Sequence, residues 1–203
     1  IENRTIFHVD CEPGEINNRI KGCHAIVADL RTFFIQFSAL DNAINFTNYE
    51  PWSKVIEDLK KQWPDTEELK PAGINPNKLI HQLAKASKNA FGYLADVGSH
   101  QMWSAQSIEI SGHQFFLTSG GMGAMGYALP ASIGASVALN KKPVVVIIGD
   151  GCMQLNIQEL QTIVRNKLPI KIIVLNNRTL GMIRQFQDSY FESRYQSTYW
   201  GYD

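Results

Sequence analysis

Two runs of mostly β-branched apolar residues constrain the fold of this chain more than any other feature of its sequence. They are residues 144–148 (VVVII) and Ile170–Leu175 (IKIIVL), and such runs are typical of strands buried on both faces of a parallel sheet. Between them, Glu159 follows Asn156 at a spacing that predicts a capping box at the start of a helix. Apolar residues then recur at helical spacing, at Ile157, Leu160, Ile163 and Val164. The segment therefore predicts a right-handed strand–helix–strand unit of a parallel sheet.

The preceding segments extend this alternation. We expect strands at residues 94–97 and Phe115–Thr118, a helix capped by Asn75 with Pro76 at its first position, and a further helix over residues 125–139. Together with the strand–helix–strand unit, they predict an α/β fold over residues 74–203. Its core would be a doubly wound, mostly parallel sheet with helices on both faces.

The first third of the chain has a weaker pattern. Short apolar runs at residues 5–10 and 25–29 lead into helical spacing at residues 30–40. Two strands and one helix cannot bury themselves, so this part is either the end of another α/β domain or an edge of the domain that follows. Residues 42–73 are interrupted by proline and predict a linker with one short helix at residues 52–62.

The charge balance disfavours several classes of partner. Nineteen basic and nineteen acidic side chains give a net charge of zero, so no long-range field would draw the chain to nucleic acid or to an anionic membrane. The longest apolar runs are far shorter than the roughly 20 residues of a membrane-spanning helix. The three cysteines, Cys11, Cys23 and Cys152, include no CxxC pair, which disfavours a disulfide framework or a zinc site and predicts a cytoplasmic protein.

Polar clusters follow both of the apolar runs. Gly149, Asp150 and Gly151 come after the first run, and Asn176 and Asn177 come after the second. Because parallel strands end at the same edge of a sheet, both clusters should face one crevice. Glycines let backbone N–H groups approach an anion, and carboxylate and amide oxygens suit Mg²⁺. The pairing indicates a diphosphate held through magnesium, although either cluster alone is also typical of ordinary turns.

Residues 121–126 spell GxGxxG, the pattern of dinucleotide-binding turns. That interpretation also requires an acidic residue about twenty positions further on, at the end of a second strand. The chain there has residues 140–143 (NKKP), which are typical of a turn. The GxGxxG match alone is weak evidence, and a non-catalytic nucleotide-binding module stays as an alternative from a different class.

The ordered series of motifs resembles the acetolactate synthase (acetohydroxyacid synthase) large-subunit group of thiamine-diphosphate enzymes. The series consists of residues 96–103 (DVGSHQMW), 118–134 (TSGGMGAMGYALPASIG), 149–151 (GDG), 176–177 (NN) and 181–182 (GM). Residues 1–40 also resemble the end of the central domain of that group, so the likeness covers nearly the whole chain. It implies that residues 74–203 have the thiamine-diphosphate-binding fold, truncated at its C-terminal end, and that residues 1–41 are the tail of the central domain.

The resemblance also implies roles for particular residues. The metal would be held by Asp150, Asn177 and the backbone oxygen of Thr179. Cofactor contacts would come from backbone N–H groups of Gly151 and Cys152, from Ser99 and His100, from the Gly123 carbonyl, and from Met125 wedged beneath the cofactor rings. Met182 and Phe186 would border the substrate. The chain departs from the group at Ser99, where Gln is usual, and at Phe186, where biosynthetic members typically carry Trp.

The activity implied by the resemblance is decarboxylation and carboligation of a 2-keto acid, dependent on thiamine diphosphate and Mg²⁺. The Glu that activates the cofactor in this group lies on another domain, and no residue of this chain matches it. The chain alone is therefore expected to be inactive, with complete sites in a homodimer or homotetramer. Two alternatives share the fold: a decarboxylase for another acyl donor, such as oxalyl-CoA or a sugar-derived keto acid, and a domain that has lost activity.

Overall fold

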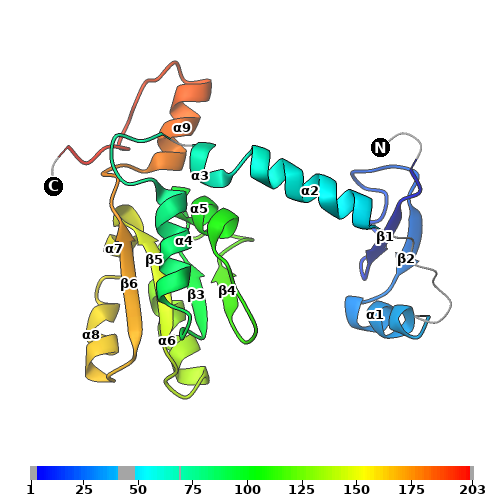
Figure 1. Cartoon of the computed structure of the whole chain (residues 1–203), viewed down its shortest axis with the longest axis horizontal. Helices are drawn as coiled ribbons and strands as arrows, with labels where there is room; N and C mark the ends of the chain where they lie inside the picture. Colours follow the sequence, from blue (N-terminus) through cyan, green and yellow to red (C-terminus); the bar gives the residue numbers. More distant parts are fainter. Residues whose placement is uncertain (1–3, 41–48, 69, 202–203) are drawn as a thin grey trace. The chain divides into compact units, whose positions relative to one another are not determined.

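The computed structural model describes residues 4–40, 49–68 and 70–201 (Figure 1). The chain divides into two compact units, Ile1–Glu57 and Asp58–Asp203, so that the boundary falls within helix α2 (Glu50–Gln62). This helix confirms the short helix expected at residues 52–62. Within the described ranges, every helix is too short or too polar to cross a membrane.

The described residues of the first unit form two short parallel strands, one helix and the beginning of α2. Strand β1 (Phe7–Asp10) pairs with β2 (His24–Val27) in the register Phe7↔His24. Helix α1 (Leu30–Ser38) begins at Asp29, whose side chain accepts a hydrogen bond of 2.9 Å from the backbone N–H of Thr32. Large apolar side chains of all three elements, including Phe7 and Phe34, are more than half exposed. The described part of this unit therefore does not bury its own apolar surface.

The second unit is built on a four-stranded parallel sheet with the order β4-β3-β5-β6. The strands are β3 (Gly92–Ala95), β4 (Phe115–Thr118), β5 (Val144–Gly149) and β6 (Ile170–Leu175). Strand β5 pairs with β3 on one side and with β6 on the other, and all of its residues are buried. The two apolar runs are thus neighbouring parallel strands, as expected, whereas β3 begins two residues earlier than predicted.

Helices cover both faces of this sheet (Figure 1). Helices α4 (Pro76–Ala86) and α5 (Ser99–Ser107) cover one face, where Val145 and Ile147 of β5 belong to the same apolar cluster as Ile80 of α4. Helices α6 (Ala128–Ala138), α7 (Asp150–Leu155) and α8 (Glu159–Arg165) cover the other face. Two further helices are α3 (Asp65–Glu68) and α9 (Gly181–Tyr190), which follows β6. The doubly wound α/β fold is therefore confirmed.

The sequence predicted helix caps at Asn75 and Asn156. The cap at Asn75 is confirmed, since its side chain accepts a hydrogen bond from the backbone N–H of Lys78. The capping box at Asn156 is wrong: the chain turns into helix α7 directly after β5, and Asn156 lies at the end of α7. Its side chain donates to the Gly126 carbonyl at 2.8 Å, so it serves a tertiary contact, and α8 begins without a side-chain cap.

A buried carboxylate connects the end of β3 to the start of α6. Asp96 follows β3 and is fully buried. Its side chain accepts hydrogen bonds from three backbone N–H groups, those of Val97 (2.8 Å), Gly126 (2.8 Å) and Ala128 (2.7 Å). Hydrogen bonds to an ionised acceptor are among the stronger ones in proteins. Asp96 therefore fixes the loop that precedes α6 against the central sheet.

This connection predicts that Asp96→Asn destabilises the protein although it hardly changes the volume of the side chain. An amide can accept at only one atom and presents its NH₂ group to backbone N–H groups, so at least one buried donor loses its partner. We expect a loss of roughly 2–4 kcal/mol in the free energy of unfolding, measured by denaturant titration. Asp58→Asn is the control, because Asp58 is exposed on α2 and its ion pair with Lys61 spans 3.7 Å. Equal stability of the two variants would contradict this role of Asp96.

Candidate functional site

A cavity of about 280 Å³ opens at the carboxyl ends of the strands of the second unit. Its walls come from the segments that follow β3, β5 and β6 and from the loop before α6, which is where parallel α/β sheets bind ligands. Ten of the eleven side chains or backbone groups predicted for the site line this cavity: Ser99, His100, Gly123, Met125, Asp150, Gly151, Cys152, Asn177, Thr179 and Met182.

The segment after β5 combines a carboxylate with closely packed backbone. Asp150 is the first residue of α7, and the N–H groups of Gly151 and Cys152 lie in the first turn, where no intrahelical acceptor is available. A Cβ atom on Gly149 would lie 2.8 Å from the His100 ring, and one on Gly151 would lie 2.7 Å from Leu180. The turn therefore requires both glycines, and its backbone can approach an anion closely.

The segment after β6 forms two successive side-chain turns. The Asn176 side chain accepts from the backbone N–H of Arg178 at 3.0 Å, and the Asn177 side chain accepts from the backbone N–H of Thr179 at 3.2 Å. The asparagines thus do what such residues commonly do after strands. An amide oxygen has two acceptor sites, so the turn at Asn177 leaves that oxygen able to ligate a cation as well.

His100 is a buried side chain with an unused polar atom. Its Nε2 has no hydrogen-bond partner among the described residues, and the ring lies between the backbones of Gly98 and Gly149. Burial lowers the pKa of His100, although the carboxylates of Asp96 and Asp150 act in the opposite direction. The imidazole is therefore neutral at neutral pH, where it can donate one N–H to a ligand. A buried polar atom without a partner is expected where a bound group completes the site.

Cys152 forms a second group of potential ligands with Asp96 and His100, whose ligand atoms lie within 4.8 Å of one another. Burial raises the pKa of the Cys152 thiol to about 12, and the neighbouring Asp96 contributes to the rise. The thiol donates to the Val97 carbonyl at 3.0 Å, and the Asp96 oxygens already accept three backbone N–H groups. Metal ligation requires a thiolate, so this group is structural and Cys152 reaches the cavity through its backbone.

The topology disfavours the dinucleotide interpretation of residues 121–126. The turn expected at residues 140–143 precedes β5, and an acidic residue, Asp150, comes directly after that strand. However, β3 lies between β4 and β5, whereas the strands that flank a dinucleotide-binding turn are neighbours in the sheet. The loop instead supplies Gly123 and Met125 to the cavity, and Gly123 adopts a φ of +67° that favours glycine.

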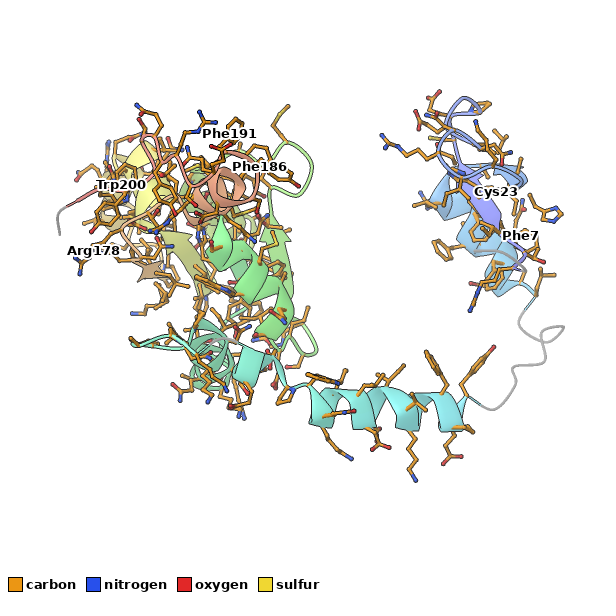
Figure 2. All side chains as sticks on the ribbon, turned by 90° about the horizontal axis from the view of Figure 1, so that it is seen from above. Phe7, Cys23, Arg178, Phe186, Phe191 and Trp200 are labelled. Carbon is orange, nitrogen blue, oxygen red and sulfur yellow. The ribbon has the colours of Figure 1, made fainter. Side chains whose placement is uncertain are left out.

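Phe186 is the one predicted site residue that does not line the cavity. Met182 and Ile183 line it from the start of α9, but Phe186 lies about one turn further along and is 54% exposed. Its ring centroid is 4.7 Å from that of Tyr190 and 5.8 Å from that of Phe191. Figure 2 shows Phe186 and Phe191 on the same part of the second unit. The described structure therefore places Phe186 in an aromatic cluster of α9 beside the site.

Three residues that support the site were not identified from the sequence. They are Asp96, Asn156 and Trp200, whose indole N–H donates to Asp150 Oδ2 at 2.6 Å. Asp96 and Asn156 occur within patterns that were recognised, so a search for side chains that could accept from or donate to the backbone of the glycine-rich loop could have suggested them. Trp200 is fifty residues from Asp150 along the chain, and its sequence context carries no such signal.

Comparison with known proteins agrees with the geometry. The family model described as "Thiamine pyrophosphate enzyme, C-terminal TPP binding domain" matches residues 96–202; thiamine pyrophosphate (TPP) is thiamine diphosphate. Acetolactate synthase large subunits are similar over nearly the whole chain, with 39% identity over 201 residues in Pyropia yezoensis and 34% over 193 in Lactococcus lactis subsp. lactis. The isozyme 2 large subunit of Escherichia coli (strain K12) is 36% identical over 194 residues.

These alignments cover 95 or 96% of this chain but only 33 or 34% of each relative. The chain therefore spans about a third of the length of the curated relatives it matches. The family match covers more than half of the chain, and its residues include those that line the cavity after β3, β5 and β6. The chain belongs to the thiamine pyrophosphate enzyme family, of which it carries the C-terminal TPP-binding domain.

Proposed function

We propose that this chain holds thiamine diphosphate through a magnesium ion, in an enzyme that decarboxylates a 2-keto acid and joins the product to a second carbonyl compound. The charge of the cavity carries the proposal. With His100 neutral, Asp150 is the one charged side chain among the described residues that line the cavity. A diphosphate beside this carboxylate would be repelled unless a cation lay between them. The charge of the cavity therefore supports a metal ion between the Asp150 carboxylate and a bound diphosphate.

The available oxygen atoms suit magnesium. Asp150 offers a carboxylate, Asn177 an amide oxygen and Thr179 a backbone carbonyl, all at the cavity wall. Mg²⁺ prefers such hard ligands and commonly completes its octahedral sphere with water and phosphate oxygens. The N–H groups of Gly151 and Cys152 would then donate to the diphosphate from one side, and His100 with Ser99 from the other.

The remaining lining residues orient the cofactor rings. A Cβ atom on Gly151 would lie 3.6 Å from Cε of Met125, so the Met125 side chain reaches the diphosphate end of the cavity and can support the rings from below. The Gly123 carbonyl would accept from the amino group of the pyrimidine. When bound, thiamine diphosphate supplies a thiazolium ring that accepts the electron pair released by decarboxylation. The contribution of this chain is to fix the cofactor geometry in advance.

The substrate and assembly follow by analogy with the relatives named as acetolactate synthases. Met182 and Ile183 border the cavity and would contact a small 2-keto acid, while oxalyl-CoA or a sugar-derived keto acid is the alternative acyl donor. Among the described residues of the cavity wall, the only carboxylate is the one assigned to the metal. The acid that activates the pyrimidine ring would therefore come from another domain or subunit, as in a homodimer or homotetramer with shared sites.

Asp150→Ala should remove Mg²⁺-dependent binding of thiamine diphosphate, because Asp150 is the only carboxylate among the described residues that line the cavity. We expect the affinity to fall by more than about 100-fold. Loss of a residue that only hydrogen-bonds to a metal ligand typically lowers metal affinity by about 10- to 100-fold, and loss of the ligand itself should cost more. Asp150→Glu should weaken binding less, since its oxygen is displaced but its charge is kept. Calorimetric titration measures both variants, with Asp58→Ala as the exposed control. Wild-type affinity in Asp150→Ala would refute the metal assignment.

Met125→Ala should reduce turnover more than it reduces affinity for the cofactor. If Met125 holds the rings in a reactive geometry, its loss misplaces the reacting atoms, and about 100-fold in kcat is the scale of such an effect. The measurement is steady-state kinetics of the complete enzyme together with calorimetry of cofactor binding. A variant with normal turnover and only a lower melting temperature would show that Met125 is a packing residue.

Cofactor binding and cofactor activation should be separable in this chain. When the 203-residue chain is saturated with thiamine diphosphate and Mg²⁺, the proton on C2 of the cofactor should exchange at the rate of the free cofactor. Addition of the activating domain should accelerate the exchange by about 10²- to 10⁴-fold. Proton NMR of samples quenched at intervals in D₂O measures both rates. Fast exchange with the chain alone would show that one of its own residues is the activating base.

A further inference from the structure

Residues 198–200 pair with the loop that carries one of the proposed metal ligands. The backbone N–H of Leu180 donates to the Thr198 carbonyl at 2.9 Å, and that of Trp200 donates to the Arg178 carbonyl at 3.0 Å. These bonds flank an antiparallel bridge between Thr179 and Tyr199. In such a pair, the residue between the two bonds directs its own N–H and C=O to the opposite side. The pairing therefore turns the Thr179 carbonyl away from residues 198–200.

The hydrogen bond made by the backbone N–H of Thr179 supports this direction of its carbonyl. Its N–H donates to the Asn177 side chain at 3.2 Å, and in an extended residue the N–H and C=O point to the same side. The carbonyl of Thr179 thus lies on the side of Asn177, and both residues line the cavity. Two of the three proposed metal ligands are brought together by the pairing of this loop with residues 198–200.

Trp200 reaches the third proposed ligand. Its indole Nε1 donates to Asp150 Oδ2 at 2.6 Å, which leaves the second carboxylate oxygen available. The ring edge, at Cζ2, lies 3.3 Å from the position that a Cβ atom on Gly151 would take. The cavity is lined by Asp150 and Gly151 but not by Trp200. The indole therefore approaches the carboxylate from behind the cavity wall and does not fill the place of a ligand.

The segment is held in place independently of the metal site. Thr198 is only 2% exposed, and its hydroxyl donates to Gln187 Oε1 on α9 at 3.1 Å. The Gln187 side chain also accepts from the backbone N–H of Gln196 (3.4 Å) and donates to its carbonyl (3.2 Å). Figure 2 shows Trp200 and Arg178 on the same side of the unit. These contacts give residues 198–200 a fixed position from which to orient other groups.

We propose that residues 198–200 position the metal ligands, with Trp200 fixing the orientation of the Asp150 carboxylate and the paired backbone aiming the Thr179 carbonyl. The inference rests on the metal site proposed above. Carboxylates that bind metals are commonly hydrogen-bonded by outer residues, and loss of such a partner typically costs 10- to 100-fold in metal affinity. Trp200 is accordingly a positioning residue, and the indole hydrogen bond persists when the metal is bound.

The test is Trp200→Phe, which keeps an aromatic ring against Gly151 but removes the indole donor. In calorimetric titrations of the 203-residue chain with thiamine diphosphate, affinity at saturating Mg²⁺ should fall by about 10-fold or more. Affinity without Mg²⁺ should be unchanged, which a general loss of structure would not produce. Trp63→Phe is the control, because Trp63 is 73% exposed. Unchanged Mg²⁺-dependent binding in Trp200→Phe would overturn the proposal. Tighter binding would also overturn it, because it would show that the indole competes with the metal for Asp150.

A spectroscopic measurement and a second variant complete the test. The indole N–H resonance that is missing from the Trp200→Phe spectrum belongs to Trp200, and in the loaded protein it should stay at its low-field, hydrogen-bonded position. Its movement to the position of a water-exposed indole on loading would overturn the proposal. Asp150→Ala in the same titrations separates the two levels of inference. If Asp150→Ala abolishes Mg²⁺-dependent binding while Trp200→Phe does not weaken it, the metal site stands and the positioning role of Trp200 is wrong. If Asp150→Ala binds normally, the proposed metal site is itself wrong.

Discussion

The Asp96 carboxylate is the contact on which the geometry of the site depends. It is fully buried behind the cavity and accepts three backbone N–H groups, two of which belong to the loop and helix start that follow Met125. In a low-dielectric interior such bonds are strong, and a missing partner is correspondingly costly. The same loop is held on its other side by the Asn156 side chain. Asp96 and Asn156 thus position Gly123 and Met125 at the cavity, although neither of them lines it.

The charge of the cavity explains why a metal ion, and not a basic side chain, is expected to hold the diphosphate. Burial keeps His100 neutral and Cys152 a thiol, so Asp150 determines the sign of the field in the described cavity wall. A carboxylate and a diphosphate can share this space only around a cation. Backbone N–H groups of the tight glycine turn and the unused nitrogen of His100 then supply hydrogen bonds without further charge. In the proposed arrangement, cofactor affinity would depend on the availability of Mg²⁺.

The sequence predicted the parts of the fold that depend on local patterns. The β-branched runs correctly identified two strands. Strand β5 is buried throughout, as such a run predicts, whereas β6 is an edge strand of the described sheet and is only partly buried. The capping box at Asn156 failed because the side chain is used by Gly126, thirty residues away in the chain. The contacts of Asp96 with the loop and of Trp200 with Asp150 also join residues thirty or more positions apart. The periodicity of a segment carries no information on contacts between residues so far apart in the chain. The ordered motifs indicated where the site lies, but not which residues support it.

The central claim is that this chain recognises thiamine diphosphate through a metal ion, and calorimetric titration of the 203-residue chain tests it most directly. Thiamine diphosphate is titrated with Mg²⁺ and again with the metal removed by a chelator, and NAD is titrated under the same conditions. The cavity charge predicts saturable binding of thiamine diphosphate that is strong with Mg²⁺ and weak without it, and no binding of NAD. Metal-independent binding of thiamine diphosphate, or saturable binding of NAD in its place, would contradict the account.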